Sequence, residues 1–286
     1  MLEEIIKENQ KIIFIDGSYF CFHRYYSFMN WWKNTYPNEE KVLENPYEND
    51  IFREKFKSTF INAVNEIPNK LLLDKIDNIC MIVGKDCRRE DIWRTKIFPE
   101  YKSGRNREGF MGKPFFKMVY EEDLFRKGGV DLILSLDTLE ADDCIAISSQ
   151  YIQKTYPDKE IYIITSDKDY LQLSSQKTHL YNLNYNKLTD QKSCHGDPKI
   201  DLFCKIVAGD PSDNITSVLK RCGEKTAIKY FYNQDLFQKK IKEENAEEKY
   251  RLNKLLVDFS QIPEPLRDGF IVKYMIPFKN IINDVI

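Results

Sequence analysis

The chain has 286 residues, of which 42% are apolar and 31% are charged, so it is long enough for one large globular domain or two modest ones. Its formal net charge of −2 excludes a globally basic nucleic-acid binder, although local basic patches remain allowed. No stretch approaches the roughly 20 apolar residues of a membrane span, and the scattered cysteines and histidines support neither a disulfide framework nor a zinc site. The acidic, amphipathic N-terminus "MLEEIIKENQK" is unlike a signal peptide, so we expect an intracellular protein that is not secreted.

Short apolar runs alternate with segments of helical length along the first two thirds of the chain. They predict buried strands at 11–16, 78–84, 129–136 and 160–167, and a further strand near an edge at 179–187. A helix is predicted over 141–156, and a loop or insertion over 33–50. Strands alternating with helices predict an α/β fold with a mainly parallel sheet flanked by helices. After about residue 200 the sequence is mainly helical, which predicts a smaller helical domain or subdomain.

Acidic side chains follow each of the four main predicted strands. They are Asp16, then Asp86, then the group Glu140, Asp142 and Asp143, and last the pair Asp167 and Asp169. Since ligands bind outside the carboxyl ends of parallel strands, we expect these acids to meet at one edge of the sheet. A lone Asp there is more often a helix N-cap or turn residue, but six or seven clustered carboxylates need multivalent cations to stay ionised. Oxygen ligands without His or Cys favour Mg²⁺ or Mn²⁺, and two such ions predict phosphoryl chemistry.

A second acidic motif, "AGDPSDN" at 208–214, places Asp210 and Asp213 three residues apart. On its own, this pattern is typical of an Asx-type turn or a helix start. Beside the other carboxylates, it predicts an additional pair of metal ligands.

The segment 85–113 holds nine Lys or Arg residues against five Asp or Glu residues, a surplus of four positive charges. Such a run also suits a solvated face, but contacts with nucleic-acid phosphates explain it better. The candidates for nucleic-acid binding are Arg88, Arg94, Lys96, Lys102, Arg105 and Arg107, with Arg24, Lys220 and Lys225 elsewhere in the chain. The stretch 19–32 is rich in aromatic residues, most of which must form core, and Tyr25 or Tyr26 is a candidate for stacking on a base.

Five segments in series resemble the 5′ nuclease family of flap endonucleases and 5′–3′ exonucleases. They are "FIDGSYFCFHRYY", "WRTKIFPEYKSGR", "LEADDCIA", "IITSDKDYLQL" and "KIVAGDPSDNITSV", which occur in the family's order over roughly residues 11–230. Within the family, the chain looks most similar to the phage replication enzymes called ribonuclease H, and "NKLLVDFSQIP" adds to that likeness. The resemblance implies a PIN-like catalytic domain at 11–199 and a helix-hairpin-helix-like DNA-binding subdomain at 200–286 that completes the active site.

The resemblance also implies roles for individual residues. A first Mg²⁺ or Mn²⁺ ion would be held or oriented by Asp16, Asp86, Glu140 and Asp142. A second ion would be held, in part through water, by Asp143, Asp167, Asp169, Asp210 and Asp213. Lys102 and Arg105 would contact the scissile phosphate and act with Asp16, Asp142 and Asp167 in catalysis. Residues about 104–127 would form an arch or gateway for a single-stranded 5′ end.

Two features depart from the family pattern. No Phe-Asp pair ends the second predicted strand, so Asp86 is assigned as the ligand because it lies seven residues before Trp93, with Asp91 as the alternative. The segment at the duplex-binding hairpin, "SVLKRCGEKTA", keeps only Gly223 and the "KTA" helix start. That form does not favour a bound K⁺ in the hairpin.

The resemblance implies a structure-specific 5′ nuclease that acts in replication or repair on DNA with 5′ flaps, nicks or RNA primers. By analogy, we expect a monomer without membrane association, in the cytoplasm, the nucleoid or a viral replication site, with a sliding clamp or single-strand DNA-binding protein as partner. Two alternatives stay open: a PIN-type ribonuclease for single-stranded RNA and a non-catalytic nucleic-acid-binding homologue. The basic segment and the region after residue 200 argue against the first, and the complete set of candidate acids argues against the second. A phosphatase with an aspartyl nucleophile is discounted, because its DxD motif should follow the first strand, where this chain has Asp16-Gly17-Ser18.

Overall fold

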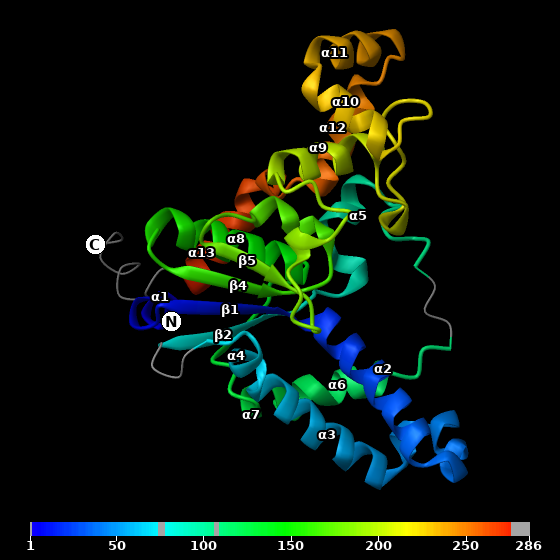
Figure 1. Ribbon diagram of the computed structural model, residues 1–286, viewed down its shortest axis with the longest axis vertical. Helices are drawn as coiled ribbons and strands as arrows, with labels where there is room; N and C mark the ends of the chain where they lie inside the picture. Colours follow the sequence, from blue (N-terminus) through cyan, green and yellow to red (C-terminus); the bar gives the residue numbers. More distant parts are fainter. Residues whose placement is uncertain (1, 74–77, 106–108, 276–286) are drawn as a thin grey trace.

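A computed structural model describes residues 2–73, 78–105 and 109–275 of the chain (Figure 1). Its centre is a five-stranded sheet in the order β3-β2-β1-β4-β5, in which all neighbouring strands are parallel. The strands are β1 (Lys11–Asp16), β2 (Ile79–Gly84), β3 (Leu132–Leu134), β4 (Glu160–Ile164) and β5 (Thr178–Tyr181). Each overlaps a predicted strand, and β5 lies at an edge. The predicted parallel α/β sheet is therefore confirmed.

Helices precede, separate and follow the strands. The α-helices are α1 (Leu2–Glu8), α2 (Gly17–Thr35), α3 (Asp50–Asn65), α4 (Ile67–Lys70), α5 (Trp93–Ile97), α6 (Lys113–Glu121), α7 (Leu124–Lys127), α8 (Ala141–Thr155), α9 (Pro198–Ala208), α10 (Glu224–Tyr232), α11 (Gln234–Glu243), α12 (Glu247–Val257) and α13 (Glu264–Tyr274). Short 3-10 helices are η1 (Pro37–Glu44), η2 (Pro46–Glu48), η3 (Arg89–Asp91), η4 (Lys168–Leu173), η5 (Leu188–Asp190), η6 (Pro211–Asp213) and η7 (Phe259–Gln261). The predicted loop at 33–50 thus contains η1 and η2. In the described ranges, no helix is long and apolar enough to cross a bilayer.

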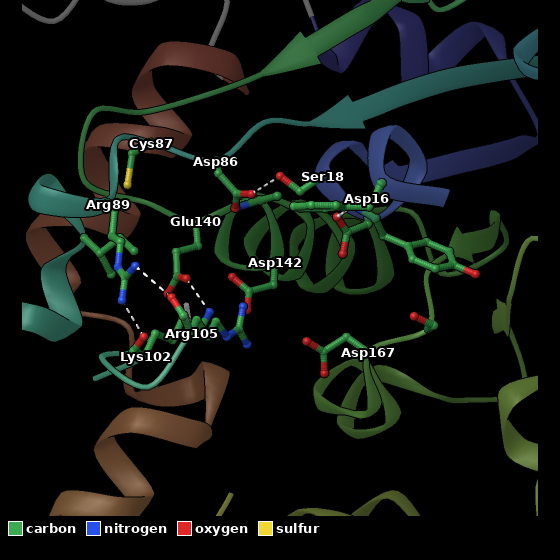
Figure 2. Close-up of a pocket in the computed structure, with 15 residues that line it drawn as sticks. Asp16, Ser18, Asp86, Cys87, Arg89, Lys102, Arg105, Glu140, Asp142 and Asp167 are labelled. Atoms are coloured by element: carbon green, nitrogen blue, oxygen red, sulfur yellow. Dashed lines mark hydrogen bonds and ion pairs between the residues drawn. The ribbon is translucent and has the colours of Figure 1, made fainter. Parts of the chain in front are cut away.

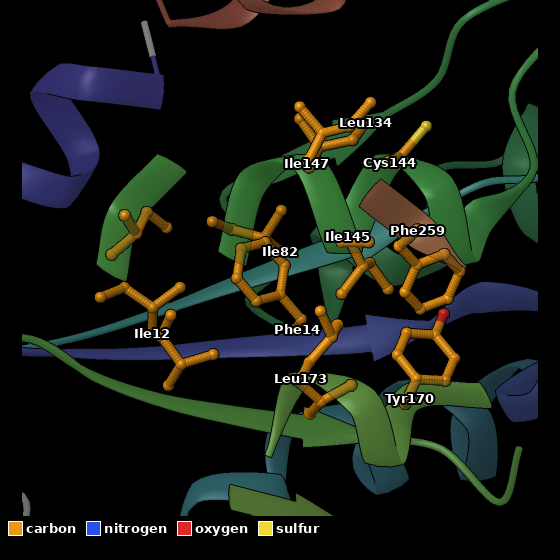
Figure 3. Close-up of a cluster of buried hydrophobic side chains, with 14 of the residues drawn as sticks. Ile12, Phe14, Ile82, Leu134, Cys144, Ile145, Ile147, Tyr170, Leu173 and Phe259 are labelled. Atoms are coloured by element: carbon orange, nitrogen blue, oxygen red, sulfur yellow. The ribbon is translucent and has the colours of Figure 1, made fainter. Parts of the chain in front are cut away.

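The two faces of the sheet bury alternate side chains of each strand. Ile12, Phe14 and Ile82 pack on one face with residues of α1, α8 and α13 (Figure 3). Ile13 and Ile15 pack on the other face with residues of α2, α3, α6 and α7. Because both faces are covered, the strands read as continuous apolar runs rather than as alternating ones.

The helices from α9 onward contribute to three buried clusters, and one of these, which holds Leu256 and Val257 of α12, also includes Ile92 and Tyr101. Helices α9, α10 and α11 share a core of their own at the top of Figure 1, built around Val207, Ala227 and Phe237. In contrast, Phe270 and Tyr274 of α13 are buried in the cluster that covers β1 and α8. The division at residue 200 stays a prediction, and the packing adds that the last described helix lies against α8, in the cluster on one face of the sheet.

The carboxyl ends of β1 and β2 approach each other closely. Asp16 pairs in register with Gly84, and a Cβ placed on Gly17 would lie 2.6 Å from the carbonyl oxygen of Gly84. The junction between β1 and α2 therefore requires glycine. This contact holds Asp16 beside the loop that follows β2.

Candidate metal centre

The acids that follow β1, β2 and β4 and begin α8 meet at the carboxyl edge of the sheet, as predicted. Figure 2 shows them around a cavity of about 320 Å³. The acidic residues that line the cavity are Asp16, Asp86, Glu140, Asp142 and Asp167, and the basic ones are Arg89, Lys102 and Arg105. This edge is the place where open α/β sheets bind their ligands.

Asp16 ends β1 and caps α2. Its carboxylate accepts a hydrogen bond from the backbone N–H of Tyr19 at 3.0 Å and one from the Thr165 hydroxyl at 3.3 Å. Burial, followed by the charges of Asp86 and Asp167, raises the pKa of Asp16 to about 7. The ionised form is therefore poorly compensated by the protein, and a cation in the cavity would stabilise it.

Asp86 joins the loop after β2 to the start of α8. It accepts hydrogen bonds from the Ser18 hydroxyl and from the backbone N–H of Ala141, the latter at 2.8 Å. It lines the cavity, whereas Asp91 lies on η3 and is not among the described residues that line it. The structure thus places Asp86, rather than the alternative Asp91, beside Asp16.

Asp142 lies in the first turn of α8 and faces the same cavity. Burial, followed by the neighbouring Glu140 and Asp143 charges, raises the pKa of Asp142 well above its ordinary value. One oxygen each of Glu140, Asp142 and Asp143 lies within 4.8 Å of the other two. Asp142 is the member of this group whose charge the protein compensates least.

Glu140 is the N-cap residue of α8 and is held by two basic side chains. It accepts hydrogen bonds from Lys102 and, at 3.0 Å, from Arg94. Burial alone would raise the pKa of Glu140, but Lys102 and Arg94 lower it below the ordinary value. Glu140 is thus an ionised, compensated carboxylate at the wall of the cavity.

Two predictions are corrected by the environment of Arg94, which is 1% exposed. Its guanidinium donates to both oxygens of Asp143, at 2.9 and 2.7 Å, and its Nε donates to the carbonyl oxygen of Leu256 at 2.8 Å. Asp143 also accepts from the Trp93 indole at 2.9 Å and is fully buried. Arg94 is therefore not free to bind nucleic acid, and Asp143, both of whose oxygens accept from protein donors, lies with Glu140 and Asp142 rather than with the predicted second group. The pair instead ties α8 to α5 and α12.

A second acidic group adjoins the first. One oxygen each of Asp169, Asp210 and Asp213 lies within 4.8 Å of the other two. Asp167 caps η4 and Asp210 caps η6, so both carboxylates are fixed by backbone N–H groups, those of Asp169 and Ser212. Burial raises the pKa of Asp169 to about 7, against an opposing effect of Lys205. All predicted second-site acids except Asp143 are thus brought together.

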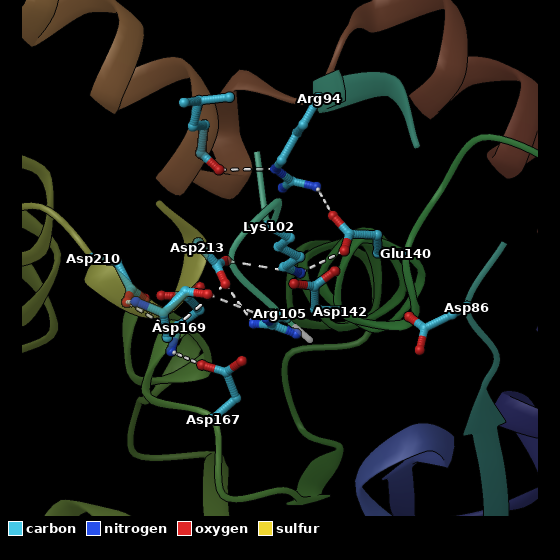
Figure 4. Close-up of polar contacts among 12 residues, drawn as sticks. Asp86, Arg94, Lys102, Arg105, Glu140, Asp142, Asp167, Asp169, Asp210 and Asp213 are labelled. Carbon is cyan, nitrogen blue, oxygen red and sulfur yellow. Dashed lines mark hydrogen bonds and ion pairs between the residues drawn. The ribbon is translucent and has the colours of Figure 1, made fainter. Parts of the chain in front are cut away.

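Lys102 and Arg105 lie between the two acidic groups (Figure 4). Lys102 pairs with Glu140 and, at 3.7 Å, with Asp213, and Arg105 also pairs with Asp213. Burial opposes the charge on Lys102, but the surrounding carboxylates of Glu140, Asp142 and Asp213 raise its pKa above the ordinary value. Both side chains are therefore cationic at the wall of the cavity.

The predicted gateway at 104–127 is too long. Residues 113–127 form α6 and α7, and Phe115, Val119 and Phe125 are fully buried in the core under the sheet. Their apolar spacing is that of a core-facing helix. The part that can serve as a gateway is therefore no longer than about 104–112, and Arg107 within it lies outside the described residues.

The predicted nucleic-acid contacts spread over several surfaces. Tyr25 is a wrong prediction, because it is 3% exposed and packs against Phe110 and Phe115. Arg24 is half-buried, whereas Arg88, Lys96, Lys220 and Lys225 are exposed and are not among the described residues that line the cavity. The aromatic residues that do line the cavity are Tyr19 and Phe22, which sequence reasoning missed. Tyr19 and Phe22 lie three and six residues after Asp16, a spacing that places them on one face of a helix such as α2, and this spacing was the available signal.

The donor set fits hard metal ions. All the converging ligands are carboxylate oxygens, and the raised pKa values of Asp16 and Asp142 indicate that the protein alone balances their charges poorly. The two acidic groups could therefore hold metal ions.

Comparisons with known proteins place this site in a family. Residues 11–197 match the N-terminal resolvase-like domain of 5′–3′ exonucleases. A 5′–3′ exonuclease of Buchnera aphidicola is 26% identical over 231 residues, which cover 77% of this chain and 69% of that protein. Ribonuclease H of Enterobacteria phage T4 is 31% identical over 158 residues, which cover 50% of each protein.

A solved structure shares the fold. The flap endonuclease of bacteriophage T5, in a complex with DNA and metal ions, has a TM-score of 0.62 at 18% identity, and the match covers 93% of this chain and 98% of that one. The predicted PIN-like fold is confirmed by this likeness and by the matched domain. The chain therefore belongs to the 5′–3′ exonuclease family, as its motifs indicated.

Proposed function

We propose that the protein hydrolyses phosphodiester bonds near the 5′ ends of DNA strands, at flaps, nicks and RNA primers, with two Mg²⁺ or Mn²⁺ ions. The observation that carries this proposal is the convergence of Asp16, Asp86 and Asp142 with Lys102 and Arg105 on one cavity. Carboxylates alone would repel a phosphodiester. These acids can therefore lie beside a phosphodiester bound by the basic pair only if metal cations lie between the acids and the phosphate.

The two acidic groups would each hold one ion. Asp16, Asp86 and Asp142 would supply oxygens to the first, with Glu140 fixed beside them by Arg94 and Lys102. Asp167, Asp169, Asp210 and Asp213 would supply the second, directly or through water. When bound, the ions supply a nucleophilic water and stabilise the leaving oxygen of the phosphodiester.

Lys102 and Arg105 would bind the scissile phosphate. Lys102 pairs with Glu140 at the cavity wall and Arg105 pairs with Asp213 of the second acidic group, and the guanidinium fork of Arg105 matches the geometry of a phosphate. The backbone of Lys102 is left-handed, with φ of 57°, and its N–H donates to the carbonyl oxygen of Asp213 at 3.0 Å. This turn fixes the direction of both side chains, so they would orient the phosphate as well as neutralise it.

The single-stranded 5′ end would pass beside residues 104–112 into the cavity. Tyr19 and Phe22 line the cavity and would stack on its terminal base, in place of the predicted Tyr25. The exposed Lys220 and Lys225 would contact the duplex through its phosphates. A sliding clamp or single-strand DNA-binding protein as partner, and a monomeric state, complete the proposal as a replication or repair nuclease.

Cleavage of a 5′-labelled flap duplex tests the proposal. Short 5′ products should appear with Mg²⁺ or Mn²⁺ and disappear with EDTA. The cleavage rate should fall at least about 100-fold for Asp167→Ala, because removing a metal ligand should reduce activity at least as much as removing a residue that only supports a ligand. Asp158→Ala is the matched control, since Asp158 is exposed in the turn before β4, at the opposite edge of the sheet.

A single-stranded RNA of the same sequence runs beside the flap. Cleavage of the RNA alone would replace this proposal with the ribonuclease alternative. Binding of the flap without any cleavage, in all metals, would identify a non-catalytic homologue.

A further inference from the structure

Lys205 of α9 places a positive charge inside the second acidic group. Its Nζ lies 2.9 Å from an oxygen of Asp210 and 3.9 Å from one of Asp167, and it also pairs with Asp169. Figure 4 shows these three carboxylates turned toward one region beside Asp213. The ammonium group thus occupies the space on which the proposed ligands of the second ion converge. In the first acidic group, the described basic side chains pair with Glu140 and Asp143. No described ion pair engages Asp142 in the way that Lys205 engages three acids of the second group.

The surroundings keep Lys205 charged. Burial of the side chain opposes the charge, but Asp169, Asp167 and Asp210 raise the pKa of Lys205 above its ordinary value. A lysine ammonium is a compact charge with three donors, so it can neutralise three carboxylates at once. A divalent metal ion carries twice the charge of an ammonium group and lies closer to the carboxylate oxygens that it binds. The two cations therefore compete for one position.

A second cavity beside the acidic group offers the side chain of Lys205 an alternative position. Lys205 lines this cavity, of about 260 Å³, together with Lys168, Asp201, Asp210 and Glu224. The four-carbon stem of lysine is flexible, and two carboxylates on the walls of this cavity, those of Asp201 and Glu224, could receive a displaced ammonium group.

We propose that Lys205 is a displaceable counter-cation of the second metal group. It neutralises Asp167, Asp169 and Asp210 in the metal-free protein and yields to a divalent ion, so that the second ion binds more weakly than the first. Lys205 is on this account a positioning residue that sets the metal affinity of one group. The inference rests on the proposed two-ion function.

Calorimetric titration of Mn²⁺ into the metal-free protein, without nucleic acid, tests the inference. Lys205→Met should tighten binding of the second ion by about tenfold or more, because it removes a like charge about one ion-pair distance away. Binding of the first ion should not change. The same variant should lower the melting temperature in EDTA, since three carboxylates lose their counter-charge. Lys205→Arg should stay close to the wild type in both measurements.

Lys168→Met is the matched control, since it removes the same charge from an exposed residue on the wall of the second cavity. Should the Met variant fail to fold, Lys205→Gln makes the same test while keeping a donor for the carboxylates. Second-ion affinity that is unchanged or weaker in these variants overturns the inference but leaves the two-ion function standing. A wild-type protein that binds no second Mn²⁺ overturns the two-ion function itself, and with it the role of Lys205.

Discussion

The two acidic groups of the site use the same residue type but balance its charge differently. Around the first, the protein directs its cations to Glu140 and Asp143, and leaves Asp16 and Asp142 with pKa values raised by burial and by their neighbours. Within the second, Lys205 pairs with Asp169 and Asp210, while Asp213 pairs with Arg105. The comparison shows that clustered carboxylates can be kept ready for a cation either by leaving them uncompensated or by giving them a replaceable one.

The largest expected effect comes from removing one acid from each group. Asp142→Asn should reduce flap cleavage at least about 100-fold, yet raise the metal-free melting temperature, because the folded state disfavours the charge that it removes. Asp210→Asn should also reduce cleavage, but lower the metal-free stability by about 1–3 kcal/mol, because Lys205 loses a charged partner. Thermal and urea unfolding in EDTA measure both changes.

The difference between the two acidic groups requires that these substitutions have opposite effects on the stability of the metal-free protein: a gain for Asp142→Asn and a loss for Asp210→Asn. If both substitutions destabilised the metal-free protein, the first group would be compensated by contacts that the structure does not show. If both stabilised it, the pairing of Lys205 would contribute nothing.

The next effect concerns the buried ion pair behind the first group. Arg94→Met should destabilise the protein by about 3–5 kcal/mol, since it leaves the fully buried Asp143 without its partner. Arg88→Met, on an exposed neighbour, should change the stability by less than about 0.5 kcal/mol. Urea unfolding measures both variants. The double variant Arg94→Met with Asp143→Leu should recover much of the loss, and failure to recover would mean that the contact with Leu256 dominates.

Most of the fold and the acids of the site could be predicted from the sequence, for local reasons. Asp16, Asp86 and Asp167 each follow an apolar run, and parallel strands bring such positions to one edge whatever the details of packing. Long-range pairing could not be read in the same way. Whether an arginine in a basic segment meets phosphate or a buried carboxylate depends on its partner, and Arg94 finds Asp143 on α8 and Leu256 near the end of α12. Lys205 was missed because nothing in "FCKIVAG" marks the three acids that surround it.

The smallest expected effect is the pH dependence of the metal-free protein. Asp16 and Asp169 have folded-state pKa values of about 7, above the ordinary value near 4 that applies in the unfolded chain. The folded state therefore binds more protons than the unfolded state between about pH 4 and 7, so the free energy of unfolding should fall as pH rises through that window. In saturating Mg²⁺ the fall should be reduced or reversed, because the ion favours the ionised forms. If the stability of the metal-free protein instead rose from pH 4 to 7, the protein would have to stabilise the negative charge of Asp16, contrary to the structure.

A matched pair of threonine substitutions assigns part of this pH dependence to Asp16. Thr165 donates to Asp16 at 3.3 Å and accepts from the backbone N–H of Asp167 at 3.1 Å, whereas the hydroxyl of the equally buried Thr178 has no hydrogen-bond partner among the described residues. Thr165→Val should cost about 1 kcal/mol and, by removing a donor to the carboxylate, extend the fall in stability to higher pH. Thr178→Val should be neutral or slightly stabilising at every pH, since no hydrogen bond is lost and a buried polar group becomes apolar. Melting curves in EDTA from about pH 4 to about pH 8, which spans the window set by these pKa values, would separate the two variants. If both variants showed the same shift with pH, the effect would come from the sheet as a whole, and the hydrogen bond to Asp16 would have no part in setting its protonation.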